Sequence, residues 1–247
     1  MRIVCLSDTH GFHDQIQVPE GDLLIHAGDL TTTGSEEEVR TVAAWLDRLP
    51  HRWKLVIAGN HDRFFEWLPE YAPAYLPAGV IYLQDSGVEI EGLRFWGSPW
   101  QPWFCDWAFN LPRRGAKLRE KWNLIPLDTD VLITHGPPHG ILDEVRGRMT
   151  AWGPSEEGSG PLGCEELAIR LATVKPRLHV FGHIHDGFGF IKKENTTHVN
   201  ASVCNEDYLP VNPVWVVDLK PDGQPLVRAM PPGKGKQRKI ERKRCVE

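Results

Sequence analysis

The chain has 247 residues, of which 41% are hydrophobic and 25% are charged, and its formal net charge at pH 7 is −5. This composition is ordinary for a folded globular protein. No apolar run approaches the roughly 18 residues that a membrane-spanning helix needs, so we predict no transmembrane segment. The apolar start of the chain turns polar at Ser7 and Asp8, which argues against a secretion signal. The five cysteines are scattered without a CxxC pair, which with the missing signal favours a reducing compartment, the cytoplasm.

The charge is unevenly distributed along the chain. Residues 232–247 carry seven basic and two acidic residues, a local net charge of +5, which leaves −10 for residues 1–231. We predict that residues 1–231 form a single domain and that residues 232–247 are a basic, disordered C-terminal tail. The acidic body is unsuited to binding the phosphate backbone of a long nucleic acid. The tail could contact acidic lipid or RNA, or it could be a solvated extension without a partner.

Short apolar runs of strand length recur along the chain, and each is followed by polar or glycine-rich residues. They lie at Ile3–Leu6, Leu23–Ala27, Leu55–Ala58, Val131–Thr134 and Leu178–Phe181. Because these runs are continuous rather than alternating, we expect strands that are covered on both faces.

Helices are predicted between some of these strands. Ser35 followed by Glu38 has the spacing of a capping box, and the residues that follow have apolar positions at helical spacing, Val39, Val42, Ala43 and Leu46. A second helix is predicted to start near Gly163 and to run through Leu171.

Two further regions have the character of strands. Turn residues at 85–87 and 91–92 separate the apolar segments of residues 79–98, which predicts a meander of Val80–Leu83, Val88–Ile90 and Leu93–Trp96. Near the end of the body, strands are predicted at Phe188–Ile191, Thr197–Asn200 and Val214–Leu219. The chain has no internal repeat, and the alternation of elements predicts an α/β core in which two sheets pack together with helices outside.

Five of the predicted strands end in residue types that bind metal ions. The residues that follow them are Asp8 and His10, then Asp29, then Asn60, His61 and Asp62, then His135, and finally His183 and His185. Open α/β sheets place their ligand crevice at the carboxyl ends of the strands. One polar residue after a strand is usually a cap or a turn, but five such ends together predict a metal site.

The donor types indicate which metals and which chemistry to expect. Carboxylates and imidazoles without cysteine favour Mn, Fe, Zn or Ni over a soft thiolate site. A pair of divalent cations about 3.5–4 Å apart can hold both the entering and the departing oxygen in phosphoryl transfer. The positive charge left over after two carboxylates have bound stabilises the negative charge that grows on phosphate oxygens.

The motif order DxH, GD, GNHD, H and GHxH resembles that of the calcineurin-like metallophosphoesterases, and the resemblance extends from residue 1 to about residue 219. The segments 97–102, 107–113, 121–126 and 199–203 look like the metallophosphoesterase-domain-containing subfamily, whose members are described as class III cyclic-nucleotide phosphodiesterases. The resemblance implies a four-layer α/β/β/α sandwich with two packed mixed β-sheets.

The resemblance also implies a ligand set for two divalent metal ions. The first metal would be held by Asp8, His10 and His185, the second by Asn60, His135 and His183, and Asp29 would bridge the two. Mn²⁺ is the first candidate, and Fe, Zn, Ni, Co or Mg are alternatives.

Two neighbouring residues would act on the substrate without binding metal. By the same resemblance, His61 would lie near the scissile phosphate, as general acid for the leaving oxygen or as a donor to a phosphate oxygen. Asp62 would orient His61, or would only cap the helix that follows.

The absence of two arginines narrows the range of possible substrates. Protein phosphatases of the same superfamily carry arginines beside the GD and GNH motifs, whereas here the first motif reads GDLTTTG and Ala58 precedes Gly59. A phosphomonoester dianion needs more positive charge than a diester. We therefore predict a small phosphodiester or nucleotide substrate, a 3′,5′- or 2′,3′-cyclic nucleotide, hydrolysed by attack of a metal-bound hydroxide on phosphorus.

Other interpretations stay open at this point. Seven aromatic residues lie within residues 95–109, and they could stack a nucleobase or close one end of the core. The protein could also be a broad-specificity phosphatase or nuclease, or a non-catalytic interaction scaffold with the same fold.

Overall fold

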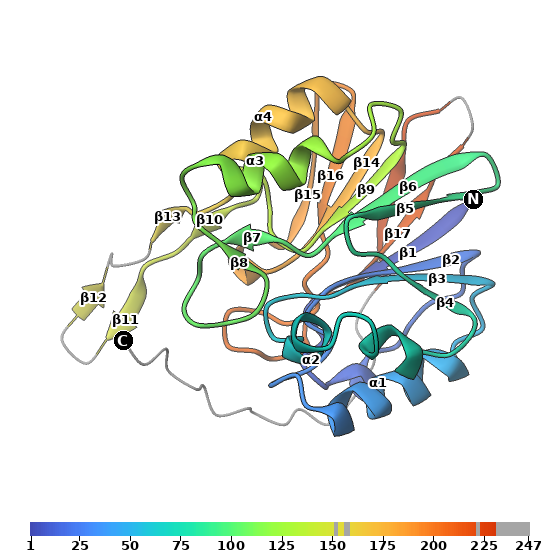
Figure 1. Cartoon of the computed structure of the whole chain (residues 1–247). Helices are drawn as coiled ribbons and strands as arrows, with labels where there is room; N and C mark the ends of the chain where they lie inside the picture. Colours follow the sequence, from blue (N-terminus) through green and yellow to red (C-terminus); the bar gives the residue numbers. More distant parts are fainter. Residues whose placement is uncertain (151–152, 156–158, 221–222, 231–247) are drawn as a thin grey trace.

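Two six-stranded sheets lie at the centre of the structure, a computed structural model that describes residues 1–150, 153–155, 159–220 and 223–230 (Figure 1). The strand order of the first sheet is β18 (Leu226–Met230), β17 (Val214–Asp218), β1 (Arg2–Leu6), β2 (Leu23–Ala27), β3 (Trp53–Ile57) and β4 (Val80–Tyr82). The order of the second sheet is β15 (Gly189–Lys193), β16 (Thr196–Asn200), β14 (Leu178–Phe181), β9 (Val131–Thr134), β6 (Leu93–Ser98) and β5 (Ser86–Ile90).

Both sheets are mixed. In the first sheet, β1 to β4 run parallel to one another, and β17 and β18 add antiparallel pairs beside β1. In the second sheet, β6, β9, β14 and β16 are parallel, and β5 and β15 pair antiparallel at the two edges. Within each sheet, the parallel strands therefore end at the same edge.

Helices cover the outer face of each sheet (Figure 1). Helices α1 (Glu36–Arg48) and α2 (Arg63–Trp67) pack on the first sheet, and α3 (Ala116–Asn123) and α4 (Glu165–Val174) pack on the second. A third apolar cluster joins the inner faces of the two sheets. The predicted four-layer α/β/β/α sandwich is confirmed.

Strand β1 shows why a continuous apolar run is needed in these layers. Its side chains alternate between faces, so Ile3 and Cys5 enter the cluster between the sheets. Val4 and Leu6 enter the cluster beneath the helices of the first sheet. All four residues are fully buried, as expected for a strand that is covered on both faces.

The helix signals in the sequence are also reproduced. Ser35 caps α1 by accepting a hydrogen bond from the Glu38 N–H, and the Glu38 side chain accepts one from the Ser35 N–H. Helix α4 begins at Glu165, with Cys164 as its N-cap residue, two residues later than Gly163.

The predicted meander of residues 79–98 is wrong in one respect. Strands β5 and β6 do form an antiparallel hairpin in the second sheet, but β4 lies in the first sheet, parallel to β3. The chain passes from one sheet to the other through Asp85, which has a positive φ of 48°. The turn signal at Asp85-Ser86-Gly87 therefore marks a change of sheet, and Ser86 and Gly87 already belong to β5.

Several short elements lie outside the two large sheets. The paired segments are β7 (Gln101–Pro102) with β8 (Asn110–Leu111), β10 (Glu144–Val145) with β13 (Gly160–Pro161), and β11 (Arg148–Thr150) with β12 (Gly153–Ser155). Short 3₁₀ helices lie at His13–Gln15, Ala72–Tyr75 and His185–Gly187. Among the described residues, no helix combines the length and apolar character needed to cross a membrane. The predicted tail, residues 232–247, lies outside the described residues.

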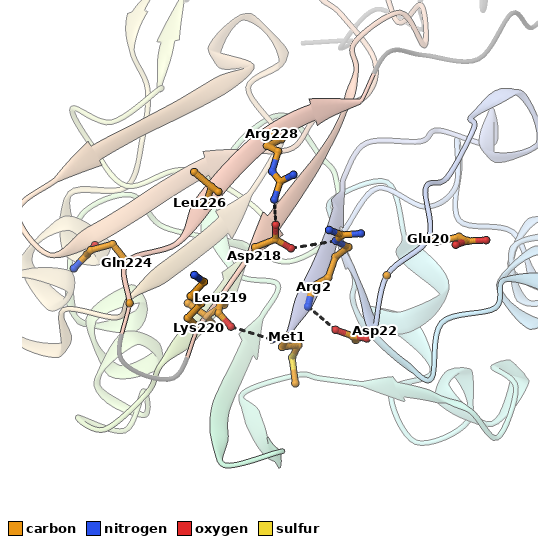
Figure 2. Close-up of a pocket in the computed structure, with 12 residues that line it drawn as sticks. Met1, Arg2, Glu20, Asp22, Asp218, Leu219, Lys220, Gln224, Leu226 and Arg228 are labelled. Atoms are coloured by element: carbon orange, nitrogen blue, oxygen red, sulfur yellow. Dashed lines mark hydrogen bonds and ion pairs between the residues drawn. The ribbon is translucent and has the colours of Figure 1, made fainter.

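A groove of about 920 Å³ lies where β1 begins and β17 ends (Figure 2). Asp218 accepts hydrogen bonds from the side chains of Arg2 and Arg228, and Asp22 accepts one from the Arg2 main-chain N–H. These charged groups are partly or largely exposed to solvent. The charged groups at this end of the sheet therefore pair with one another at the surface.

Candidate metal centre

The parallel strands bring the predicted ligands and His61 together at their carboxyl ends. Asp8 and His10 follow β1, Asp29 follows β2, Asn60 and His61 follow β3, His135 follows β9, and His183 and His185 follow β14. The donor atoms of the aspartates and histidines among them form three overlapping groups, and within each group all donors lie within 4.8 Å of one another. The two sheets therefore contribute to one site, as we expected from the strand ends.

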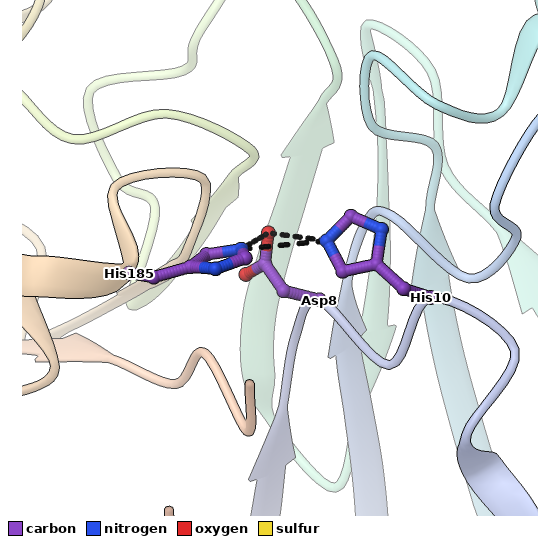
Figure 3. A group of neighbouring side chains, drawn as sticks. All are labelled: Asp8, His10 and His185. Atoms are coloured by element: carbon purple, nitrogen blue, oxygen red, sulfur yellow. Dashed lines mark hydrogen bonds and ion pairs between the residues drawn. The ribbon is translucent and has the colours of Figure 1, made fainter. Parts of the chain in front are cut away.

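The first group consists of Asp8, His10 and His185 (Figure 3). His185 Nε2 lies 3.3 Å from Asp8 Oδ1, and His10 Nε2 lies 4.0 Å from the same oxygen. The two Nε2 atoms are 3.3 Å apart. The two rings thus approach one carboxylate from either side, and the three donors converge on a small volume.

The second group consists of Asp29, His135 and His183, with Asn60 among them. Asn60 Oδ1 lies 2.9 Å from His135 Nε2 and 2.9 Å from His183 Nδ1. Asp29 Oδ2 is 3.4 Å from His135 Nε2. The Asn60 oxygen, the Asp29 carboxylate and two ring nitrogens therefore meet at this point.

Asp29 connects the two groups. Its Oδ2 atom lies 3.4 Å from His135 Nε2 and 3.7 Å from His10 Nε2. A third set of donors, from His10, Asp29 and His61, also meets the 4.8 Å limit. Of the predicted ligands, Asp29 is thus the one whose position fits a bridge between two ions.

Contacts behind the donors fix the orientation of the rings. The Nδ1 atoms of His135 and His185 face the carbonyl oxygens of Ala27 and Asn205, at 2.9 and 2.8 Å. Because a carbonyl only accepts, each Nδ1 carries the proton and each Nε2 faces the site. Asp8 is held by Ser202, whose hydroxyl donates to Oδ2 at 2.7 Å.

The site concentrates negative charge in a buried place. Asp8 and Asp29 are 0% and 2% exposed, and no lysine or arginine among the described residues forms an ion pair with either carboxylate. Burial alone would raise the pKa of both, but the neighbouring histidines, His185 for Asp8 and His135 for Asp29, hold each pKa below its ordinary value. Ionised carboxylates buried in this way need compensating positive charge.

The histidines divide into two kinds. Burial lowers the pKa of His10 and of His183 to about 3, so both present neutral rings. Burial also acts on His135 and His185, but the adjacent carboxylates outweigh it, raising the pKa of His185 and raising that of His135 to about 9. Metal binding would displace the additional proton that His135 and His185 carry when charged, since imidazole ligates in its neutral form. Two carboxylates, one amide oxygen and four imidazoles without a thiolate fit divalent cations of the Mn, Fe, Zn and Ni type.

Unusual main-chain geometry lets the ligands converge. Asp8, His10, Asp29 and His183 have φ of 56°, 42°, 54° and 68°, a left-handed conformation that is uncommon for residues other than glycine. Gly182, which precedes His183, allows the close approach, because a Cβ atom there would clash with the Asp8 carboxylate. The sequence motif therefore reflects packing between strand ends as well as ligand chemistry.

His61 lies beside these groups and is held by a main-chain oxygen. Its Nδ1 atom is 2.7 Å from the Thr32 carbonyl oxygen, so this nitrogen carries a proton. Its main-chain N–H donates to Asp29 Oδ1 at 2.8 Å. The sequence offered no motif by which the Thr32 contact could have been found.

Asp62 does not cap the helix that follows it, which was one of the two roles that we predicted for it. Its side chain forms no capping hydrogen bond to α2. Its carboxylate accepts instead from the N–H groups of Gly59, Leu30 and Thr31 and from the Thr31 hydroxyl, at 2.7–3.2 Å. Burial and the charge of Asp29 raise the pKa of Asp62 to about 6. Asp62 thus joins the loops after β2 and β3. Its side chain is linked to His61 through the Thr31 hydroxyl, which lies 3.2 Å from the His61 carbonyl oxygen.

Aromatic side chains surround the site. Trp107 stacks on the His61 ring with centroids 4.1 Å apart, and Phe104 meets His183 edge-on at 5.4 Å. The Tyr208 ring lies 4.8 Å from that of His10 and 5.0 Å from that of His185. Within residues 95–109, Phe95 and Phe109 are buried core residues. The predicted aromatic stretch therefore divides between core and rim, and Tyr208 was not predicted because it lies in no motif.

Arg63 does not replace the arginines that the motifs lack. Its guanidinium donates to the Asp106 carbonyl oxygen at 2.6 Å and lies over the Trp107 ring at 4.6 Å. It is thus engaged by residues 103–109, the segment between β7 and β8 that we call the rim loop.

Comparison with known proteins agrees with this architecture. Residues 1–187 match the family model for calcineurin-like phosphoesterases. Metallophosphoesterase domain-containing protein 1 of Homo sapiens is 48% identical over 241 residues, which covers 88% of this chain and 71% of that protein. A UPF0046 protein of Caenorhabditis elegans is 37% identical over 219 residues, 83% of this chain and 71% of its own length.

A solved structure extends the agreement to the fold. A crystal structure of a candidate 5′-nucleotidase from Staphylococcus aureus superposes with a TM-score of 0.52 at 14% identity. The match covers 97% of this chain, which spans 56% of the length of that chain. At this identity the likeness concerns the fold alone.

Proposed function

We propose that this protein, which belongs to the calcineurin-like phosphoesterase family, is a two-metal phosphodiesterase that hydrolyses a small diester such as a 3′,5′- or 2′,3′-cyclic nucleotide. Membership of the family supports the coarser statement, a metal-dependent phosphoesterase. The observation that carries the proposal is the convergence of buried donors from both sheets into overlapping groups that share Asp29 and His10.

The donors divide naturally between two cations. Asp8, His10 and His185 would hold the first ion, and Asn60, His135 and His183 the second, with Asp29 between them. When bound, such a pair of divalent cations activates a water molecule and stabilises charge on the phosphate oxygens. Mn²⁺ is our first choice among the metals that suit these donors.

The chain's own residues would position and protonate the substrate. With Nδ1–H committed to the Thr32 carbonyl oxygen, the other ring nitrogen of His61 is the one that can hold a proton for the leaving oxygen. A general acid at this position contributes about 10²- to 10⁴-fold in rate. Asp62 would support it indirectly, by holding Thr31 and the loop that supplies the carbonyl.

A diester is favoured by the charge around the site. A phosphomonoester dianion is best bound by guanidinium groups that form paired hydrogen bonds. The arginine nearest to the GNHD motif, Arg63, is engaged by the Asp106 carbonyl oxygen and the Trp107 ring. A diester carries one negative charge and therefore needs less positive charge from the site.

The test is a panel of phosphate esters assayed with Mn²⁺ and other divalent ions. We expect cyclic nucleotides to be hydrolysed with a higher kcat/KM than a linear dinucleotide or a nucleoside monophosphate. A clear preference for the monoester would overturn the proposal and favour a broad phosphatase. Absence of bound metal after incubation with excess Mn²⁺ would favour a scaffold instead.

One substitution tests the assignment of His61. We expect His61→Gln to lower kcat on a cyclic nucleotide by about 10²-fold or more while elemental analysis shows unchanged metal content. Wild-type turnover of a diester with a poor leaving group by this variant would refute the acid role.

A further inference from the structure

We infer that Trp107 is a positioning residue that holds the imidazole ring of His61 in the orientation needed to protonate the leaving oxygen. The inference rests on the proposed function, because it assigns a task to the same site. It is carried by the way in which Trp107 contacts His61 and by the contacts that hold Trp107 in place.

The contact between the two rings is face to face. Their centroids are 4.1 Å apart and their planes are inclined by only 26°. The other rings beside His61 meet it differently, His10 edge-on with planes 80° apart and Tyr208 tilted at 59° and 6.3 Å. Among the ring contacts of His61 within the described residues, only that with Trp107 is stacked.

The stack with Trp107 restricts the tilt of the His61 ring, which the hydrogen bond to Thr32 does not. The bond from His61 Nδ1 to the Thr32 carbonyl oxygen, at 2.7 Å, fixes one atom of the ring. A single hydrogen bond tolerates tilt of the ring about that atom, because acceptor geometry at a carbonyl is broad. The indole face restricts that tilt, so the two contacts together define the plane and the direction of the free nitrogen.

Trp107 can serve this role because its own loop is firmly tied. The Asn110 side chain donates to the carbonyl oxygens of Phe104, Cys105 and Trp107, at 2.8–3.2 Å. On the other side of Trp107, the Ala108 N–H donates to the Asn60 carbonyl oxygen at 3.0 Å.

The turn that carries His61 also holds the indole. The Arg63 guanidinium lies 4.6 Å from the Trp107 ring centre and donates to the preceding carbonyl, that of Asp106, at 2.6 Å. His61 and Arg63 thus both contact the same indole from one short segment of chain. The stack is therefore built into the junction between the turn after β3 and the rim loop.

Substrates with different leaving groups can show whether Trp107 positions the general acid. Departure of a sugar alkoxide depends strongly on protonation in the transition state, whereas a nitrophenolate departs without it. A misplaced acid therefore slows hydrolysis of a cyclic nucleotide and spares bis(p-nitrophenyl) phosphate. A merely structural defect would slow both.

The experiment compares Trp107→Leu and Trp107→Phe with wild type in the full-length, Mn²⁺-loaded protein. We expect Trp107→Leu to lower kcat on a cyclic nucleotide by about 10- to 100-fold with little change in KM or metal content. Turnover of bis(p-nitrophenyl) phosphate should fall less than about 3-fold. Trp107→Phe, which keeps an aromatic face, should recover most of the loss.

Two controls complete the kinetic test. Trp67→Leu removes a tryptophan that is 63% exposed on α2 and should leave both activities unchanged. In a His61→Gln background, Trp107→Leu should add no further loss on the cyclic nucleotide. Equal losses on both substrates, or an additive loss in the double variant, would overturn the inference.

A spectroscopic measurement tests the stack independently of activity. In the Zn²⁺-loaded, histidine-labelled protein, the ring current of the indole should shift the His61 ring protons upfield. Trp107→Leu should abolish that shift, and Trp107→Phe should retain part of it. No change would refute the stack, while wild-type protein that binds metal but hydrolyses neither diester would instead refute the proposed function.

Discussion

Strand β1 connects two clusters of charged groups that differ in how their charge is balanced. At its start, Arg2 and Arg228 pair with Asp218 at the surface, where the Arg2 side chain is 50% exposed. Beyond its other end, Asp8 is fully buried, and the residues around it are histidines and a second buried carboxylate. In the first cluster, the arginines balance the charge of Asp218, and the surrounding water screens the charges of all three side chains.

The difference shows why burial, rather than the number of charges, identifies the functional end of the sheet. An exposed ion pair contributes only about 0–1 kcal/mol, so its loss is tolerated. A buried carboxylate is costly unless a positive charge balances it. Beside Asp8 and Asp29, within the part of the chain that the structure describes, that charge can come only from histidines, which a bound metal ion would replace. Four predictions test this comparison, in order of decreasing expected effect.

The largest effect should follow Asp29→Asn, which removes the carboxylate between the two donor groups. We expect turnover to fall by about 10²- to 10³-fold and bound metal to decrease. At 100 times its dissociation constant, Mn²⁺ should stabilise the wild-type protein by about 2.7 kcal/mol, or about 5–10 °C in Tm. Thermal unfolding with and without Mn²⁺ measures this increase, which the variant should lose. Normal metal content in the variant would contradict the bridging position of Asp29.

The next effect should come from Asp62→Ala, because the carboxylate satisfies buried N–H groups of two loops. Leaving such donors unpaired should lower the free energy of unfolding by about 3 kcal/mol, measured by urea denaturation without metal. Thr31→Val removes the hydroxyl, which contacts Asp62 at 2.7 Å and the His61 carbonyl oxygen at 3.2 Å, but keeps the main-chain N–H bonds to Asp62, and it should cost about 1 kcal/mol. Equal costs for the two variants would show that Asp62 does not join the loops.

A smaller effect is expected in the pH dependence of stability. Burial, with the nearby charge of Lys193, lowers the pKa of His198 to about 4. The unfolded chain binds a proton near pH 6.5, so the stability due to neutral His198 is present above that pH and is lost as the pH falls toward 4. Between pH 7 and pH 5 this loss is about 2 kcal/mol.

The Thr134 hydroxyl donates to the Gly136 carbonyl oxygen and so accepts from His179 Nε2, which leaves His179 Nδ1 as an acceptor, 3.3 Å from His198 Nδ1. The variant His198→Asn isolates the contribution of His198, because an asparagine side-chain N–H can still donate to His179. Unfolding at several pH values should give a shallower acid slope for the variant. An unchanged slope would mean that other groups, His179 among them, dominate the acid response.

The smallest effect should follow Asp218→Asn in the surface cluster. Although this carboxylate contacts both Arg2 and Arg228, we expect the free energy of unfolding to change by less than about 0.5 kcal/mol. Activity and Mn²⁺-induced stabilisation should match wild type. A loss comparable to that of Asp62→Ala would remove the contrast between the two ends of the strand.

Features that depend on local pattern were predictable from the sequence. Continuous apolar runs located the central strands, and the capping box at Ser35 located the start of α1. The parallel strands then placed residues as distant as Asp8 and His185 at one edge, because carboxyl ends of parallel strands coincide. For these reasons the four layers and the gathering of the donors could be expected before the structure.

Features that depend on long-range packing were not predictable. Strand β18 is mostly exposed and lacks a marked apolar pattern, and β4 joins the first sheet although its sequence continues toward β5. The carbonyl group that holds His61 belongs to the main chain of Thr32. Because every residue has such a group, the sequence does not reveal this contact. Tyr208 reaches the site by a loop in which it adopts a φ of 57°, and no motif marks that loop.

The left-handed main chain at Asp8, Asp29 and His183 has a consequence for protein engineering. Copying the donor side chains onto the strand ends of another α/β scaffold would not recreate the centre, because ordinary right-handed turns would aim the same side chains elsewhere. A successful transplant would have to carry the short loops together with their glycines. The structural element to transfer is therefore the set of turns, because the identities of the ligand residues do not by themselves determine where the side chains point.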